Sequence, residues 1–416
     1  MKTKSKLQFN TEPFHLRNAG VVYALIVLGA VLTIVTAISD QLNYLDPTNI
    51  ANILDQASLV GLLAISMTLV LIGGNFDLSI ASVAALSGAI ALKLIDRYGV
   101  APAVTGALLT GVLFGLINGV LVQIVGINAF IVTLGTLTAG RGLVLILTDA
   151  RTISAQSNAF LSLENDSWTT PNLLLVAGII LLILGIVRLL LRARRSQKIS
   201  LEPGSALLTL LGICLLVASF FVNWEWSLTH PVYFMLGFML VTWAILRYTV
   251  FGRHLYAVGG NTEAARLSGV NVNAYKIGTF VLNGLTASFV GILYTGKLGA
   301  INPNALTGTE LTVLAAAILG GTSLFGGSGS VVKSVIGALI LFMLANGFNV
   351  LNLGANYQGL IEGTVLIAAA AIYTIAGRYR RTGGAGKWPL KTSTDLSRKQ
   401  DDLVTSGSTE HIQQGR

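Results

Sequence analysis

The chain has 416 residues, of which 53% are hydrophobic and 11% are charged. Because soluble domains carry about 25% charged residues, this composition excludes a soluble globular protein and indicates an integral membrane protein. The single cysteine, Cys214, leaves no disulfide to form, and the four histidines are too scattered for a metal site, so we predict no metal and no cofactor. The net charge of +9 would suit nucleic acid, but its distribution indicates membrane orientation, and we predict no nucleic-acid partner.

Long apolar segments recur along the chain. A helix that crosses about 30 Å of hydrocarbon needs about 20 apolar residues, and this criterion predicts an all-α polytopic membrane protein with about twelve transmembrane helices. The predicted segments are 19–38, 56–72, 77–95, 101–122, 129–148, 172–191, 204–222, 231–247, 277–296, 310–321, 330–349 and 357–376. The tenth segment is too short to span straight across, so we predict a half-helix or a broken helix there.

The basic residues predict the orientation. Of the 27 lysines and arginines, 21 lie in residues 2–17, 188–198, 247–276 and 378–399 or at the last position. With twelve spans these regions share one side, which the positive-inside rule assigns to the cytoplasm. We therefore predict a basic cytoplasmic N-terminus over 1–18 with no cleavable signal peptide, a transmembrane domain over 19–376, and a disordered cytoplasmic tail over 377–416.

Two parts of the sequence share a plan. Thr68 to Ile90 and Leu314 to Ile340 each contain an apolar run, a Gly-Gly break, a short polar turn and a helix rich in serine, alanine and glycine. Transporters are commonly built from two repeats with broken helices near the pathway. The alternative is that two Gly-Gly breaks occur by chance in a glycine-rich membrane protein.

A polar loop over 251–276 separates two apolar segments and contains its own short helix. Asn261 is a good N-cap, Glu263 lies in the first turn, Arg266 lies toward the last turn, and Gly269 is placed to close the helix. A helix of two turns is too short to be stable alone. The helix is either part of an ordinary structured loop or a docking element for a cytoplasmic partner.

The chain carries no energy-coupling chemistry of its own. It contains no P-loop, zinc-protease or nucleophile-elbow motif, so we predict no catalytic residues and no enzyme activity. Few ionisable residues lie within the spans, namely Asp77, Arg141, Glu310 and Glu362. A proton-coupled carrier usually needs a relay of such groups, so their scarcity disfavours a self-powered transporter.

These buried charges have two interpretations each. Asp77 is either the N-cap of the third span in a thin cytoplasmic turn or, with Asn75 and Ser79, a lining of the translocation pathway. Arg141 forms a structural ion pair, with Asp149, Glu310 or Glu362 as the candidate acid, or it lines the pathway. Glu310 is a first-turn anion of a half-helix or faces the outer cavity.

Glycine recurs every fourth residue in the fourth span, at Gly111, Gly115 and Gly119. Small residues at this spacing let helices approach closely, so we predict that this stripe packs against another helix. Asn118, Asn283 and Asn346 are amides within spans, and we expect helix–helix hydrogen bonds for them rather than substrate contacts.

Four stretches carry a family resemblance. The segments GRHLYAVGGNTEAARLSGVNV, GGNFDLSIAS, NAFIVTLGTLTAGRGL and ILGGTSLFGGSGSV resemble the sugar permeases of bacterial ABC importers of the ribose/xylose/arabinose group. The extra helix pair over about 172–222 is similar to that of xylose-type permeases. The resemblance implies a type II ABC importer-like permease that works as a homodimer in the bacterial inner membrane.

The resemblance also implies partners and a coupling element. The partners would be a cytoplasmic ATPase with two fused nucleotide-binding halves and an extracytoplasmic sugar-binding protein. The coupling helix would comprise Asn261, Glu263, Ala264, Ala265, Arg266 and Gly269. The expected function is import of a monosaccharide, D-xylose foremost. The alternatives are ribose, arabinose or galactose, then a branched-chain amino acid or nucleoside permease, and then a self-powered carrier or channel.

Overall fold

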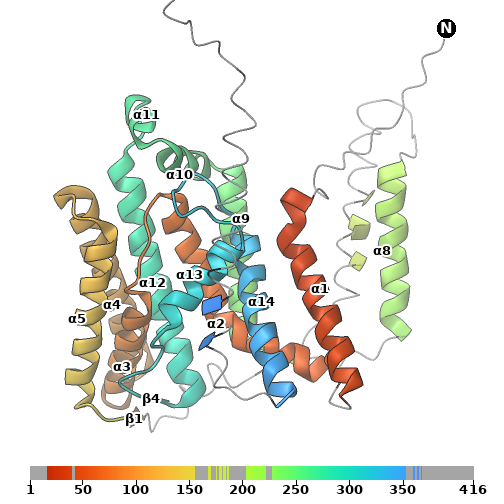
Figure 1. Cartoon of the computed structure of the whole chain (residues 1–416), viewed down its shortest axis with the longest axis horizontal. Coiled ribbons are helices and arrows are strands. Elements are labelled where there is room, and N and C mark those ends of the chain that lie inside the picture. The colour runs from red at the N-terminus through yellow and green to blue at the C-terminus, as the bar shows by residue number, and fades with distance from the viewer. Residues whose placement is uncertain are drawn as a thin grey trace, which may run out of the picture. The chain divides into compact units, whose positions relative to one another are not determined.

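The structure is a computed structural model. It describes residues 16–39, 43–154, 167–169, 203–221 and 227–352, with short stretches between 175 and 186 and between 359 and 367. The described helices are α1 (Leu16–Ile38), α2 (Pro47–Ile72), α3 (Ile80–Tyr98), α4 (Val100–Val120) continued by the π-helical turn η2 (Leu121–Val125), α5 (Ala129–Thr148), α8 (Pro203–Phe221), α9 (His230–Tyr248), α10 (Val250–Gly260), α11 (Thr262–Leu267), α12 (Val272–Leu298), α13 (Thr309–Leu319) and α14 (Val331–Val350) (Figure 1).

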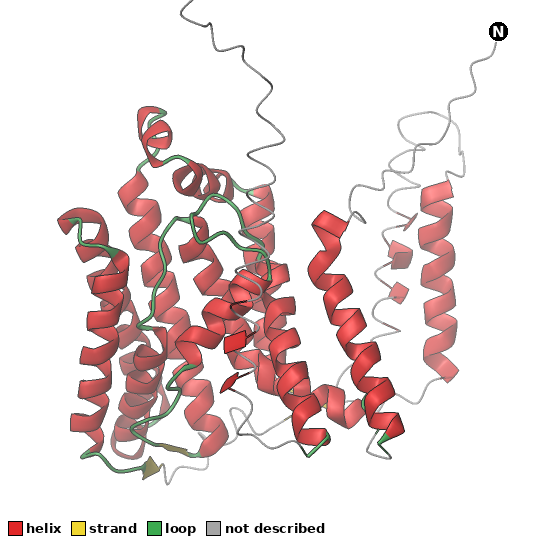
Figure 2. Cartoon of the chain, viewed as in Figure 1, coloured by secondary structure: helices red, strands yellow, loops and turns green. Residues whose placement is uncertain are grey.

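Strands are confined to two short ladders in the connections. β1 (Ile153–Ser154) pairs antiparallel with β4 (Ala300–Ile301), and β2 (Ser167–Thr169) pairs antiparallel with β3 (Ser227–Thr229). Helices make up nearly all of the regular structure in the described ranges (Figure 2). The prediction of an all-α polytopic fold is confirmed.

Ten of the twelve predicted spans are helices in the described part of the chain. Seven helices there are long and apolar enough to cross a membrane. α13 has 11 residues and is about 16 Å long at 1.5 Å per residue, so the predicted half-helix is confirmed. The predicted spans 172–191 and 357–376 lie largely outside the described residues, as do Glu362, the basic run 188–198, the first 15 residues and the tail over 377–416.

Side-chain caps explain several helix boundaries. Asp46 accepts a hydrogen bond from the Thr48 amide at 2.9 Å and Pro47 takes the first helical position. α2 therefore begins nine residues before the predicted start at 56. Asn271 likewise caps α12 through the Ala274 amide at 3.1 Å, which adds a turn before the predicted start at 277.

The core is built around α12, which packs against α2, α3 and α4, while α14 packs against α2, α13 and α1. The predicted glycine stripe of α4 lies on α12. A Cβ atom on Gly111 would stand 2.0 Å from the Gly284 carbonyl oxygen, and one on Gly115 would stand 2.4 Å from that of Phe280. Gly119 faces Ile277 at 3.0 Å in the same way. Only glycine allows these two backbones to approach so closely.

The described residues between 175 and 186 contact α8. A Cβ atom on Gly178 would lie 2.8 Å from the Leu216 side chain, and one on Gly185 would lie 2.6 Å from that of Thr209. The earlier glycine, Gly178, meets the later residue of α8, Leu216, and the later glycine, Gly185, meets the earlier residue, Thr209. The contacts are those of an antiparallel helix pair, the arrangement expected for the extra pair over 172–222.

Candidate functional site

The two Gly-Gly breaks end their helices in the same backbone conformation. Gly73 and Gly320 are right-handed, whereas Gly74 and Gly321 are left-handed with φ of +82° and +80°. In each break the second glycine and the residue after it donate to carbonyls three and five residues back, which is the Schellman arrangement. This shared geometry supports the predicted repeat over a chance occurrence of two Gly-Gly pairs.

After the first break the chain turns back into the helix bundle. Asp77 accepts a hydrogen bond from Asn283 Nδ2 at 3.1 Å, and Asn283 is the twelfth residue of α12. Eleven residues of helix rise about 16 Å, so Asp77 lies deep within the span of α12. Irregular backbone at such depth is tolerated where protein buries it. The prediction of Asp77 as the N-cap of the third span in a thin turn is therefore wrong, and α3 begins at Ile80.

Four donors surround the Asp77 carboxylate, whose residue is 1% exposed. Oδ1 accepts from the Ser79 amide at 2.9 Å, from Ser79 Oγ at 2.6 Å and from Asn118 Nδ2 at 3.5 Å, while Oδ2 accepts from Asn283. Ser66 Oγ on α2 donates in turn to Asn283 Oδ1 at 2.7 Å. Because a buried charge is costly unless its oxygens are bonded, this network holds the first break against α2, α4 and α12.

Two amide atoms of this cluster have no partner among the described residues. Asn75 Nδ2 and Asn118 Oδ1 are buried without a hydrogen bond, on residues that are 8% and 0% exposed. Buried polar atoms are nearly always paired. These two atoms are therefore the positions in the first break at which an additional polar group would be stabilised.

The second break is filled by hydroxyl groups. Thr68 Oγ1 on α2 donates to Ser334 Oγ on α14 at 2.7 Å, and Thr322 Oγ1 lies 3.3 Å from the same Ser334 oxygen. All three residues are at most 1% exposed. This cluster ties the loop over 320–330 to α2 without any charged group.

Both breaks meet α10 through glycine. The Gly327 amide donates to the Ile72 carbonyl at 2.9 Å, where α2 ends. A Cβ atom on Gly259 would lie 1.7 Å from the same Ile72 oxygen, and one on Gly326 would lie 2.8 Å from Gly74 Cα. Tyr256 Oη adds a hydrogen bond to the Gly329 carbonyl at 2.9 Å. We call these contacts the glycine junction, and Figure 1 shows the loops after α2 and α13 passing α10.

α11 follows the glycine junction directly. Asn261 caps it by accepting from the Ala264 amide at 2.9 Å, and the left-handed Gly269 closes it with a Schellman pair. The short helix predicted from the sequence is therefore present. The preceding α10, in contrast, was predicted as loop. Its N-cap is Thr249, whose hydroxyl accepts from the Gly252 amide at 3.4 Å.

The two faces of α11 differ. Ala265 is 5% exposed and packs with Val258 and Val272. Ala265, one of the residues predicted for the coupling helix, therefore faces inward, and its methyl group anchors α11 to α10 and α12. The outer face presents Leu267, which is 82% exposed, together with the Glu263–Arg266 pair at 3.7 Å.

Arg141 bonds to backbone carbonyls near the opposite end of the bundle. Its Nη1 donates to the Ala305 carbonyl at 2.7 Å and to that of Pro303 at 3.1 Å, in the loop that precedes α13. Arg141 has no ion pair within the described ranges, so Asp149 and Glu310 are not its direct partners, while Glu362, the third candidate acid, lies outside the described residues. Glu310 interacts with Arg141 only through the electrostatic field, and Glu310 Oε2 is buried without a hydrogen-bond partner there.

A cluster at the same end links three helices. The Lys297 ammonium group at the end of α12 pairs with Asp55 on α2, and the Thr229 hydroxyl beside α9 donates to the same carboxylate. Both charged residues are visible in the sequence, Asp55 before a predicted span and Lys297 after the end of another. Their 242-residue separation concealed the pairing.

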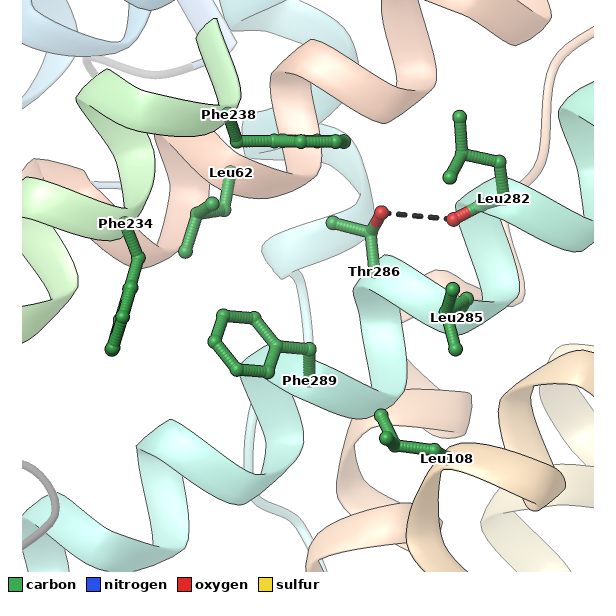
Figure 3. Close-up of a pocket in the computed structure, with 8 residues that line it drawn as sticks. All are labelled: Leu62, Leu108, Phe234, Phe238, Leu282, Leu285, Thr286 and Phe289. Carbon is green, nitrogen blue, oxygen red and sulfur yellow. Dashed lines mark hydrogen bonds between the residues drawn. The ribbon is translucent and has the colours of Figure 1, made fainter. Parts of the chain in front are cut away.

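An apolar cavity of about 320 Å³ lies between α2, α4, α9 and α12. Figure 3 shows its lining, which is Leu62, Leu108, Phe234, Phe238, Leu282, Leu285, Thr286 and Phe289. The Thr286 hydroxyl already donates to the Leu282 carbonyl at 2.8 Å, and the Phe234 and Phe289 rings pack edge-to-face at 5.4 Å. The cavity offers no free polar group to recognise a hydroxylated ligand.

Sequence reasoning missed the partners of Asp77 and the exposed apolar residues. Asn118 and Asn283 were expected to bond between helices, but their shared acceptor was not identified. Leu267 and Phe325 are 82% and 88% exposed, and Leu267 shares the outer face of α11 with the Glu263–Arg266 pair. A leucine in a short polar helix was the only sequence signal for that surface.

The fold is that of a polytopic helical membrane protein, and residues 49–370 match the family described as "Branched-chain amino acid transport system / permease component". The chain belongs to this family. Among its relatives, the xylose transport system permease protein XylH of Haemophilus influenzae is 33% identical over 364 residues, which cover 85% of this chain and 96% of that protein.

Two Escherichia coli K12 proteins are similarly related. The ribose import permease protein RbsC is 33% identical over 350 residues, 84% of this chain and 92% of the relative. The xylose transport system permease protein XylH is 34% identical over 338 residues, 78% of this chain and 84% of the relative. No solved structure gives a significant match to the chain.

Proposed function

We propose that the chain is the membrane-spanning subunit of an ATP-binding cassette importer. It carries a monosaccharide, D-xylose foremost, from an extracytoplasmic sugar-binding protein into the cytoplasm. The relatives named for xylose and ribose transport support a sugar over a branched-chain amino acid. Their nearly equal identities leave ribose as the second candidate.

The observation that carries this proposal is the connection from α11 to both breaks. α11 presents Leu267, Glu263 and Arg266 outward, and α10 joins it to the ends of α2 and α13 through the glycine junction. A surface helix with this link suits a subunit that is driven from outside the membrane. The driver is a cytoplasmic ATPase with two fused nucleotide-binding halves, which places α11 and both termini on the cytoplasmic face of a bacterial inner membrane.

The glycine junction is suited to pass a movement of α11 to the two Gly-Gly breaks. Its contacts are made by backbone atoms, with Gly327 bonded to Ile72 and Gly259 packed on the same carbonyl. Side chains adjust by changing rotamer, whereas packed backbones must move together. A displacement of α11 by the ATPase would therefore shift both breaks at once through α10.

The first break supplies the polar part of the pathway in this proposal. Asp77 and Ser79 are occupied by their mutual hydrogen bonds, so they position the loop. The unpaired amide atoms of Asn75 and Asn118 are the groups available to sugar hydroxyls. Arg141 and Glu310 act at the outer end, where the arginine shapes the loop before α13 and the carboxylate faces the entry.

A second copy of the chain completes the proposed permease. α5 carries an open face of small residues at Gly135, Ala139 and Gly142, and a Cβ atom on either glycine would meet nothing within 4 Å. Small residues at helical spacing favour close helix association in membranes. We propose α5 as part of the homodimer contact.

Uptake of labelled xylose and ribose tests the proposal. Proteoliposomes would hold the chain with its ATPase and binding protein, comparing wild type with the double variant Glu263→Ala/Gly269→Val. Glu263 lies on α11, Gly269 follows its end, and both are exposed, so the variant should insert and fold but lose ATP-driven uptake. The matched control is Gly99→Val, which puts the same side chain at a left-handed glycine with φ of +83° and open surroundings between α3 and α4.

Each outcome is informative. Uptake that needs all three components and fails only in the α11 variant supports the coupling role, and the faster sugar identifies the substrate. Uptake that persists in the double variant would place ATPase docking elsewhere. Sugar flux through the chain alone would instead indicate a self-powered carrier.

A further inference from the structure

A second cavity lies where α9 ends. It has a volume of about 360 Å³ and is lined by Trp243, Leu246, Arg247, Tyr256, Ser330 and Val331. It therefore joins the last turn of α9, α10 and the first residues of α14. Unlike the cavity of Figure 3, it is lined by a cationic group.

One wall of this cavity carries a positive charge, that of Arg247, and the other lining residues are uncharged. Arg247 is exposed and has no carboxylate partner among the described residues. The sequence contains no aspartate or glutamate between Glu225 and Glu263, the stretch that supplies α9 and α10. None occurs between Glu310 and Glu362 either, the stretch that supplies α14. An anion entering here meets no repelling group on these elements.

Hydrogen-bond donors complete the site. Ser330 precedes α14, and its hydroxyl makes no capping bond, so the first amides of this 20-residue helix are left without a side-chain acceptor. A helix N-terminus favours an anion. The Tyr256 hydroxyl is already committed to the Gly329 carbonyl and serves as a wall.

The position of the cavity at the end of a span favours an anion that belongs to a membrane lipid over a soluble one. Arg247 lies in the last turn of an apolar helix, at the level where a span leaves the hydrocarbon. Trp243 and Tyr248 pack edge-to-face there with ring centroids 5.6 Å apart, and they are 40% and 69% exposed. Exposed tryptophan and tyrosine at this level are typical of the membrane interface.

We propose that this cavity binds the phosphate of an anionic phospholipid, held by the Arg247 guanidinium group and the Ser330 end of α14. The lipid would brace α9 against α14 beside the glycine junction. The site follows from the charge and depth of the cavity and does not require the proposed sugar transport.

Native mass spectrometry of the purified chain in detergent tests this directly. Phosphatidylglycerol and phosphatidylcholine are titrated against wild type, Arg247→Gln and the control Arg253→Gln. Arg253 is exposed on α10, six residues along the chain, and does not line the cavity. We expect wild type to retain phosphatidylglycerol preferentially, Arg247→Gln to bind it about fivefold more weakly, and Arg253→Gln to resemble wild type.

A second variant, Ser330→Ala, and competition by inorganic phosphate distinguish a lipid site from a site for a soluble anion. Ser330→Ala, on the opposite wall, should weaken binding in the same direction by less, and it carries the test if Arg247→Gln does not fold. Equal effects of the two arginine substitutions, or equal binding of the two lipids, would overturn the proposal. Displacement of phosphatidylglycerol by millimolar inorganic phosphate would assign the site to a soluble anion and reject the lipid.

Discussion

After Gly73–Gly74 the chain turns back beside α4 and α12, whereas after Gly320–Gly321 it turns back beside α2 and α14. The glycines adopt the same pair of conformations in both places. The first turn is filled by a carboxylate with two carboxamides, and the second is filled by three hydroxyls. Similar backbone can therefore enclose different chemistry, because glycine sets the chain direction and the neighbouring helices supply the polar partners.

The largest expected effect lies where the two breaks meet. Gly259→Ala places a Cβ atom 1.7 Å from the Ile72 carbonyl oxygen, and backbone cannot give way as a side chain can. We expect a loss of about 3 kcal/mol or more of stability, seen as a lower melting temperature in detergent. Gly278→Ala on the exposed side of α12, with nothing within 4 Å, is the control. Similar melting temperatures for the two variants would contradict the packing of the glycine junction.

The next effect distinguishes the charged break. Asp77→Ala removes the acceptor of Asn283 and Ser79 and leaves these buried donors unpaired, whereas Asn118 keeps its bond to Ser79 Oγ. We expect a loss of about 2–3 kcal/mol, measured by thermal unfolding of the purified protein. Asp77→Asn should lose less because one oxygen remains. Glu263→Ala, which removes an exposed carboxylate, should change stability by less than about 0.5 kcal/mol; an equal effect at both positions would mean that the buried network does not stabilise the fold.

The hydroxyl break should be less sensitive. Ser334→Ala removes the oxygen shared by Thr68 and Thr322, but no charge is left unpaired, so we expect a loss of about 1 kcal/mol. The same unfolding measurement applies, with exposed Ser268→Ala as the control. A loss as large as that of Asp77→Ala would show that charge is not what separates the two breaks.

The smallest effect should be confined to one break. Tyr256→Phe deletes the hydrogen bond from α10 to the Gly329 carbonyl and leaves the contacts of α10 with Ile72 in place. Burial raises the pKa of Tyr256, so its hydroxyl remains a donor at neutral pH. We expect about 0.5–1 kcal/mol, with faster hydrogen exchange in 322–330 and unchanged exchange in 73–79. Tyr98→Phe at an exposed ring is the control, and equal acceleration in both loops would count against a break-specific bond.

Much of the local structure was predictable. α5 runs over the predicted 129–148, α13 is the expected half-helix, and Asn261 and Gly269 bound α11. These features follow from apolar length, from side chains that cap nearby amides, and from glycine in a left-handed turn. Each depends on residues within a few positions of one another.

The site was less predictable. Asp77 was predicted either to cap the third span in a thin cytoplasmic turn or to line the pathway, since its neighbours, Gly73 and Gly74, end a span. Its true position depends on Asn283, which lies 206 residues away. Arg141 was predicted either to pair with an acid or to line the pathway. In the described residues it donates to backbone carbonyls, which are present at every position and so leave no mark in a sequence.

Residue patterns alone were enough to predict the membrane-spanning class, the spans that the structure describes, the repeated Gly-Gly breaks and the capped helix α11. The tertiary structure decided that both breaks meet α10, that Asp77 lies deep in the bundle, that Ala265 is an anchor and that Leu267 is exposed. The two groups of features differ in how far apart along the chain the interacting residues lie. Hydrophobic length and capping act between neighbours along the chain, whereas close backbone contacts and buried polar partners join segments that only folding brings together.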